Sequence, residues 1–165
     1  MKFIKQMKSI GGCQPALDWA EGKTFEEAYE TSQWGEWMGF TFNGVNPGDI
    51  RSHKVAAKCA LVVKNKMNNE AIELCNKAIA FSESSIDTLD LMRVKHLAKK
   101  DAIIDIKKRN EMTQEQCANN AAKLCLSGNI SAACYWAAGA GDEVYIQAKC
   151  ADIIRKELPK ETWNL

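Results

Sequence analysis

Two capping boxes constrain the fold of this chain more than any other feature. Glu27 follows Thr24 by three residues, and Gln116 follows Thr113 by three. In this pattern a hydroxyl and a longer polar side chain exchange hydrogen bonds with the first turn of a helix. Apolar residues then recur at intervals of three and four, and no segment alternates convincingly between apolar and polar residues. The sequence therefore predicts an all-α protein, with the first ten residues as strand or coil.

Turn-forming and capping residues divide the chain into about seven or eight helices. Pro15 suits a first helical turn, Asp49 can cap the helix that follows it, and Pro159 stops the last one. One expected helix covers 25–33, is interrupted at Gly35 and continues through Phe40. The others cover residues 15–20, 50–67, 70–83, 84–110, 113–128, 131–139 and 142–158.

Length and charge limit the kinds of protein this chain can be. With 165 residues, 46% of them hydrophobic, it can bury one sizeable core but not two typical ones, so we expect a single helical bundle over 1–165. Twenty-two basic residues balance 21 acidic ones, so no overall field draws the chain to nucleic acid or to a membrane. The apolar stretches, such as the one around 60–63, are far below the roughly 20 residues that span a bilayer. We expect a cytoplasmic protein.

The cysteines and the known catalytic motifs give no sign of an enzyme. Seven cysteines without any C-x-x-C pair predict reduced thiols that pack as small apolar side chains, rather than disulfides or a zinc site. The sequence holds no phosphate-binding glycine loop, no H-E-x-x-H and no G-x-S-x-G. We predict no enzymatic activity, no cofactor and no metal.

The segment 50–67 combines a buried helix with one basic edge. At about 100° per residue, Arg51, Lys54 and Lys58 share a narrow ridge, while apolar residues cover most of the remaining surface. The ridge is either a solvated face or one wall of an anion site. His53, on the apolar side, is expected to be a core histidine. The basic run from Arg93 to Arg109 is expected to be a solvated helix face, with Asp101 and Asp105 pairing locally.

Aromatic residues are concentrated near the start of the chain. The six rings are those of Trp19, Phe25, Tyr29, Trp34, Trp37 and Phe40. Most are expected to pack the N-terminal helices onto the helix 50–67, and Trp163 is expected to dock the C-terminal tail. If one or two rings reach a cleft beside Arg51, they offer a stacking surface next to positive charge, which suits a nucleotide. The candidate ligand-binding residues are Trp34, Glu36, Trp37, Arg51, Lys54 and Lys58, with Glu36 as acceptor for a ribose hydroxyl.

The same N-terminal region resembles a family of helical immunity proteins from bacterial polymorphic toxin systems, which is also widespread in phages. The shared pattern comprises C-x-x-A-x-x-W, a capped E-E-A-[WY] and a G-[DE]-W-M turn, found here in Cys13–Trp19, Glu26–Tyr29 and Gly35–Met38. The resemblance to this family continues at Arg51, in the segment AACYWAAGAG and in the segment CADIIRKELP near the end. Glu36 stands where the pattern usually has aspartate, and Gln33 where a basic residue is common.

The resemblance implies a helical, non-enzymatic protein of conflict between bacteria and phages that binds and neutralises something. One hypothesis is sequestration of a small nucleotide-type immune signal, which requires an anionic ligand and allows a homo-oligomer. The alternative is an immunity protein that neutralises a protein toxin through an exposed patch. A third class, an enzyme acting on a nucleotide, would need a general base or metal that the sequence does not display.

Overall fold

The computed structural model describes residues 2–84, 88–99, 102–103 and 105–165, and within them it contains helices and no strand. The predicted all-α fold is confirmed. The α-helices are α1 (Lys2–Ser9), α2 (Gln14–Ala20), α3 (Phe25–Thr31), α4 (Gly35–Val45), α5 (Arg51–Ala60), α6 (Asn69–Ser82), α7 (Thr88–Lys99), α8 (Gln114–Cys125), α9 (Ile130–Ala138) and α10 (Glu143–Glu157). Three short 3₁₀ helices are η1 (Leu61–Lys66), η2 (Ile106–Glu111) and η3 (Lys160–Thr162).

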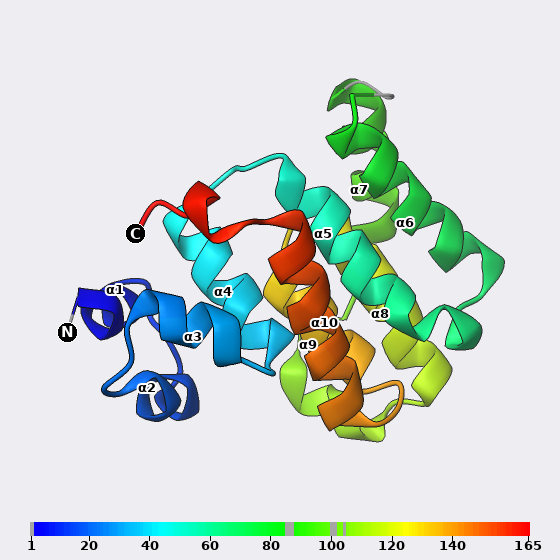
Figure 1. Cartoon of the computed structure of the whole chain (residues 1–165). Coiled ribbons are helices and arrows are strands. Elements are labelled where there is room, and N and C mark those ends of the chain that lie inside the picture. Colours follow the sequence, from blue (N-terminus) through cyan, green and yellow to red (C-terminus); the bar gives the residue numbers. More distant parts are fainter. Residues whose placement is uncertain (1, 85–87, 100–101, 104) are drawn as a thin grey trace.

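Helix α9 lies at the centre of the bundle. Its sequence ISAACYWAA carries no charge, as expected for a helix that is covered on all sides. Helices α4, α5, α8 and α10 pack around it, and α6 covers the outer side of α5 and α8 (Figure 1). Small side chains allow this close packing: a Cβ atom placed on Gly39 would lie 2.5 Å from Ile130. A main core of many alanines and cysteines results.

Helices α1 to α3 enclose a second, smaller core beside α4 (Figure 1). Phe3 and Met7, one helical turn apart on α1, are buried against Ala16, Ala20 and Ala28. The prediction of strand or coil for the first ten residues was therefore wrong. Two apolar residues at i and i+4 were too short a pattern to signal a helix, and burial of this pair stabilises it.

Capping chemistry places several helix ends where the sequence predicted them. Both capping boxes form: the Thr24 N–H donates to Glu27 Oε2 at 2.8 Å, and the Thr113 N–H to Gln116 Oε1 at 2.8 Å. Asp142 accepts a hydrogen bond from the Tyr145 N–H at the start of α10. These local signals work because each needs only neighbouring residues.

Two predicted long helices are shorter in the structure. The α-helix expected over 50–67 ends at Ala60 and continues as η1, where Val63 departs from helical geometry at φ −106° and ψ 29°. The helix expected over 84–110 is interrupted, because residues 102–103 are not helical, and its residues 85–87, 100, 101 and 104 lie outside the described part. The described residues hold ten α-helices rather than seven or eight because α1 was not expected and because the segment from residue 25 forms two separate helices, α3 and α4.

The C-terminal tail returns to the N-terminal helices (Figure 1). Trp163 is buried, donates its indole N–H to the Leu158 carbonyl oxygen at 3.0 Å and contacts Phe25, Tyr29 and Phe42. This confirms its predicted docking role. No helix among the described residues has the length and apolarity needed to cross a bilayer.

Candidate functional site

The basic residues of the ridge on α5 form ion pairs with acidic side chains. Arg51 Nη2 lies 2.5 Å from Asp49 Oδ2, and hydrogen bonds from Arg51 hold the pKa of that carboxyl below its usual value. Lys58 Nζ lies 2.6 Å from Glu157 Oε1, and Lys54 Nζ lies 2.8 Å from Glu83 Oε1 and 3.7 Å from Glu157 Oε2. Each charge of the ridge therefore already has a counter-charge.

Glu157 receives both lysines at the C-terminal end of α10. Burial by itself raises the pKa of Glu157, but the hydrogen bond from Lys58 and the charges of Lys58 and Lys54 outweigh it, so the net pKa is lowered. The carboxylate is thus kept ionised. An anionic ligand at Lys54 or Lys58 would have to compete with it.

Glu36 lies near the opposite end of α10. The Glu36 N–H donates to Gln147 Oε1 at 2.9 Å, and the Gln147 amide reaches the Glu36 carboxylate at 3.5 Å. Burial raises the pKa of Glu36, and the positive charge of Arg109 partly opposes this shift. Gln147 and Glu157 are ten residues apart on one helix, which is about 15 Å along its axis. Glu36 and the two lysines therefore do not converge on one ligand.

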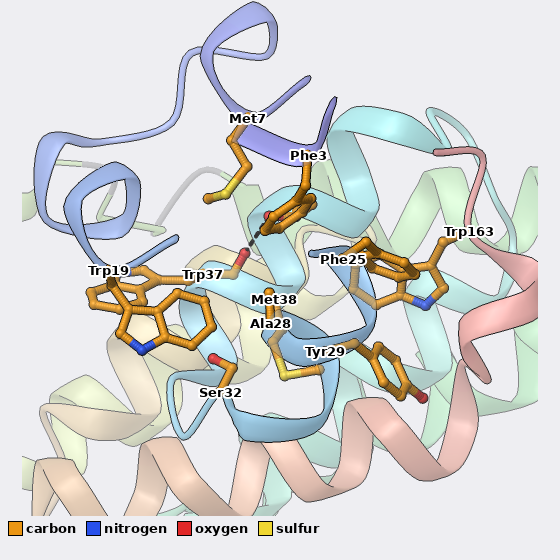
Figure 2. Close-up of a pocket in the computed structure, with 11 residues that line it drawn as sticks. Phe3, Met7, Trp19, Phe25, Ala28, Tyr29, Ser32, Trp37, Met38 and Trp163 are labelled. Atoms are coloured by element: carbon orange, nitrogen blue, oxygen red, sulfur yellow. Dashed lines mark hydrogen bonds between the residues drawn. The ribbon is translucent and has the colours of Figure 1, made fainter. Parts of the chain in front are cut away.

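The aromatic rings pack against each other rather than around a ligand-sized space. Trp34 stacks on Trp37 with ring centroids 5.2 Å apart, and Trp19 lies 5.7 Å from Trp37. Trp37 also lines an apolar cavity together with Phe3, Phe25 and Trp163 (Figure 2). The open space is about 20 Å³, enough for roughly one water molecule. A nucleobase does not fit there.

The rings also pack on partners other than those expected. The sequence predicted that they would join the N-terminal helices to the helix that begins at residue 50. Instead, Tyr29 donates its hydroxyl to the carbonyl oxygens of Arg155 and Leu158, and Phe25 contacts Phe3 and Trp163. These contacts join α3 to α1 and to the C-terminal end of the chain, because the tail returns to the N-terminal helices.

A more spacious depression runs along the outer face of α10, between this helix and the end of α5 with η1. We call it the α10 groove. Its lining residues are Lys58, Leu61, Val62, Tyr145, Lys149, Asp152, Ile153, Lys156 and Glu157. It consists of two adjoining hollows of about 390 and 310 Å³ that share Val62, Ile153 and Lys156. Both hollows are open to solvent, so a ligand bound there would keep part of its surface exposed.

The α10 groove combines an apolar floor with basic walls. Val62 and Ile153 are half-buried, whereas Lys149 and Lys156 are exposed. Among the described residues, no carboxylate forms an ion pair with either lysine. The Tyr145 ring is 58% exposed, and Lys149 Nζ lies 5.5 Å from its centroid. The groove thus offers a ring, two available ammonium groups and apolar surface.

The carboxylates and one lysine in the groove are engaged in ion pairs. Asp152 pairs with Arg155 at 3.0 Å, and Glu157 pairs with Lys58 at 2.6 Å. Lys58 is the one residue that belongs to both the predicted site and the α10 groove. Tyr145, Lys149 and Lys156 were missed by sequence reasoning, although their spacing of four and seven residues places them on one face of a helix.

In the basic run before α8, Arg93, Lys107 and Lys108 are exposed as expected, but Arg109 is not. Arg109 keeps only 13% of its side chain exposed, lies 3.0 Å from Glu143 and stands over the Tyr135 ring at 4.3 Å. Arg109 therefore belongs to the packing of η2 against α9 and α10. Asp101, which was expected to pair locally, lies outside the described residues. His53 contacts the Phe81 ring edge-on at 4.9 Å, consistent with a structural role.

The cysteines are free thiols, and all but one are buried. Cys13 is exposed, while Cys59, Cys75, Cys117, Cys125, Cys134 and Cys150 are buried. This confirms the predicted packing role for six of the seven. Three of the buried sulfurs nevertheless gather in one place, those of Cys59, Cys134 and Cys150. Their separation along the sequence gave no sign of this.

Comparisons of the chain with protein-family models, with curated proteins and with solved structures gave no match. The likeness to immunity proteins drawn from the sequence therefore stays a prediction, and the site must be interpreted from its own geometry.

Proposed function

We propose that this protein is a non-enzymatic binding protein that holds a small anionic ligand of the nucleotide type in the α10 groove. The observation that carries the proposal is the pair Lys149 and Lys156, two exposed lysines without an ion-paired carboxylate among the described residues, beside a hollow floored by Val62 and Ile153. Phosphate groups bind ammonium groups through charge-assisted hydrogen bonds. A base can stack on the exposed Tyr145 ring or lie on the apolar floor.

Binding without chemical change is supported by the state of the groove carboxylates. Asp152 and Glu157 are held by Arg155 and Lys58, so neither is positioned as an available general base. If the resemblance to immunity proteins holds, such binding would sequester a nucleotide-type immune signal in conflict between bacteria and phages. The proposed site is not the one predicted from the sequence at Trp34, Glu36, Trp37, Arg51 and Lys54. At that predicted site the cavity beside the rings is smaller, and the basic side chains already form ion pairs.

Calorimetry against a panel of linear and cyclic nucleotides tests the proposal. We expect saturable binding, and we expect mass spectrometry to recover the ligand unchanged after the protein is denatured. Altered ligand would show an enzyme instead. The absence of any nucleotide binding tighter than about 100 μM would contradict sequestration.

One observation favours a protein toxin as the alternative partner. Val144 and Tyr145 are 64% and 58% exposed, and they adjoin a groove that is open to solvent. An apolar pair beside two lysines suits an acidic protein surface. Val144→Asp separates the two functions. It would abolish binding to an acidic protein, whereas a nucleotide held by Lys149 and Lys156 would lose severalfold in affinity at most.

A further inference from the structure

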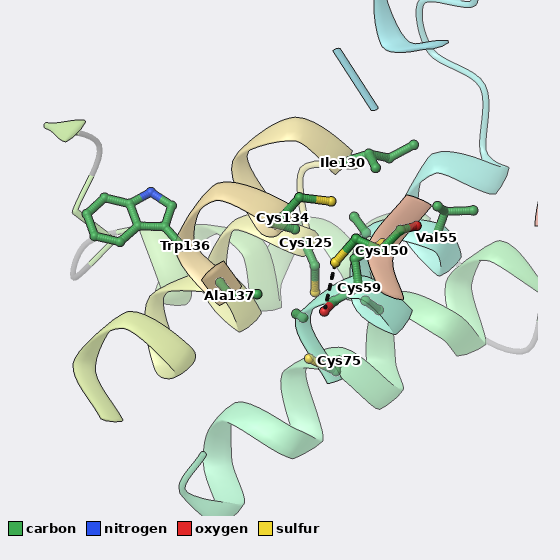
Figure 3. Packing of buried hydrophobic residues seen from close by; sticks show 14 of the residues in the cluster. Val55, Cys59, Cys75, Cys125, Ile130, Cys134, Trp136, Ala137 and Cys150 are labelled. Atoms are coloured by element: carbon green, nitrogen blue, oxygen red, sulfur yellow. Dashed lines mark hydrogen bonds between the residues drawn. The ribbon is translucent and has the colours of Figure 1, made fainter. Parts of the chain in front are cut away.

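Three cysteines converge inside the main core, far apart in sequence but close in space. Cys59 belongs to α5, Cys134 to α9 and Cys150 to α10, and each is fully buried. Their sulfur atoms all lie within 4.8 Å of one another. Figure 3 shows the three side chains among the surrounding core residues. They form a triangle of identical soft donors, which we call the cysteine triad.

The triad is close to the size needed to hold a single ion. Zinc–thiolate bonds are about 2.3 Å long, which places three sulfurs around one ion about 4 Å apart. Small side-chain rotations would bring the sulfurs from their present spacing to that value. Thiolates select soft, thiophilic elements over hard cations such as Mg²⁺ or Ca²⁺.

Apolar side chains and carbonyl oxygens surround the triad. Cys59 Sγ lies 3.9 Å from the Cys150 carbonyl oxygen, and Cys150 Sγ lies 3.8 Å from the Cys59 carbonyl oxygen, so the thiols point at acceptors. Neighbours on the same helices include the fully buried Ala60, Ala133 and Ala151. Three thiolates around a monovalent or divalent ion would leave net negative charge in this apolar core, which carries a desolvation penalty. Three thiolates around a trivalent ion leave none.

We propose that Cys59, Cys134 and Cys150 form a three-sulfur site for a trivalent thiophilic element, with arsenite as the ligand. At neutral pH arsenite is the small uncharged acid As(OH)₃. Each thiol replaces one hydroxyl group: an As–S bond forms, an As–O bond breaks, and the thiol proton leaves with the hydroxyl as water. Three thiols thus yield one neutral As(SR)₃ unit and three water molecules. Arsenic stays in the trivalent state, so no oxidant or reductant is needed.

The site joins three of the helices that pack in the main core. Bonds from α5, α9 and α10 to one atom would cross-link positions 59, 134 and 150 and restrict the unfolded chain. We therefore expect bound arsenite to raise the thermal midpoint of unfolding. This inference does not rest on the proposed function of the α10 groove, because the groove lies on the outer face of α10 and the triad on its inner face.

Native mass spectrometry of the full chain with arsenite tests the triad. We expect the folded wild type to gain one arsenic atom and lose three hydrogen atoms after incubation long enough for the core to open transiently. Cys134→Ala should bind at least about a hundredfold more weakly, because the third bond is lost. Cys125→Ala is the matched control, since it removes another fully buried cysteine and leaves the triad intact. It should bind as the wild type does.

X-ray absorption spectroscopy of the wild-type complex needs no substitution, so its result cannot be affected by a misfolded variant. Three sulfur neighbours around arsenic, in protein whose circular dichroism spectrum stays helical, are expected. Two sulfurs, or arsenic bound only to unfolded chain, would overturn the proposal. So would zinc or cadmium binding to the triad more tightly than arsenite, since this would contradict the argument from charge.

Discussion

The aromatic cavity and the α10 groove differ in the two properties that a ligand site needs. The cavity has many rings but only about 20 Å³ of open space, and the contacts of its rings tie the chain termini together. The groove has one exposed ring, yet it has hollows of about 390 and 310 Å³ and two lysines that form no ion pair with a described carboxylate. The rings of the first region therefore stabilise the fold, while the lysines beside open apolar surface make the second region the proposed binding site.

The lysines around α10 show the same difference on a smaller scale. Lys54 and Lys58 on α5 both approach Glu157 on α10. Lys149 and Lys156, which belong to α10 itself, face solvent. A count of positive residues in the sequence treats all four alike. Their partners decide which of them can bind an anion.

Trp163→Ala should have the largest effect and should be confined to stability. Removing this buried ring and its hydrogen bond to Leu158 is expected to lower the free energy of unfolding by about 3–5 kcal/mol. Urea denaturation followed by circular dichroism measures the change. Nucleotide affinity of the folded variant should equal that of the wild type. Loss of affinity in a variant that is still folded would show that the aromatic region takes part in binding.

Glu157→Gln should have a smaller effect that depends on pH. The pKa of Glu157 is lowered in the folded protein, so its ionised form stabilises the fold at neutral pH and this contribution is lost as the pH falls through the folded pKa. We expect the variant to be about 1 kcal/mol less stable at pH 7, after allowing for solvent around the lysines. The difference should begin to shrink near the ordinary glutamate pKa of about 4.3 and should vanish only below the lowered folded pKa.

The same variant sharpens the comparison of the lysines. Glu157→Gln releases Lys58, which lines the α10 groove, while Lys54 keeps its ion pair with Glu83, so affinity for an anionic ligand should rise severalfold. Glu73→Gln, which breaks the Lys77 pair on α6 instead, is the matched control and should leave affinity unchanged. Equal affinity in all three proteins would indicate that the ligand binds elsewhere.

Arg51→Ala should have the smallest effect. The Arg51–Asp49 pair is partly exposed, at 40% of the arginine side chain and 18% of the aspartate side chain, so its loss is expected to cost about 1 kcal/mol of stability or less. Nucleotide affinity should not change. If Arg51 held the anionic ligand, as in the site predicted from the sequence, its loss would weaken binding about ten- to hundredfold. Calorimetry on this one variant therefore separates the two placements of the site.

Local chemistry explains what the sequence could predict. Thr24 with Glu27 and Thr113 with Gln116 determine helix starts through contacts three residues apart, and both were predictable. Contacts between distant residues were not: Lys58 meets Glu157 across 99 positions, and the cysteine triad needs three separate helices to pack. The break at Val63 also depends on packing rather than on a Gly or Pro signal.

Calorimetry on two matched pairs of lysine substitutions tests the central claim most directly. For the best nucleotide of the panel, Lys149→Ala with Lys156→Ala should weaken binding about thirtyfold, from about 1 kcal/mol for each exposed charge. A matched change of two lysines on α1, Lys5→Ala with Lys8→Ala, should leave affinity within about twofold, apart from the general effect of net charge. If the two double variants bind equally well, the α10 groove is not the ligand site.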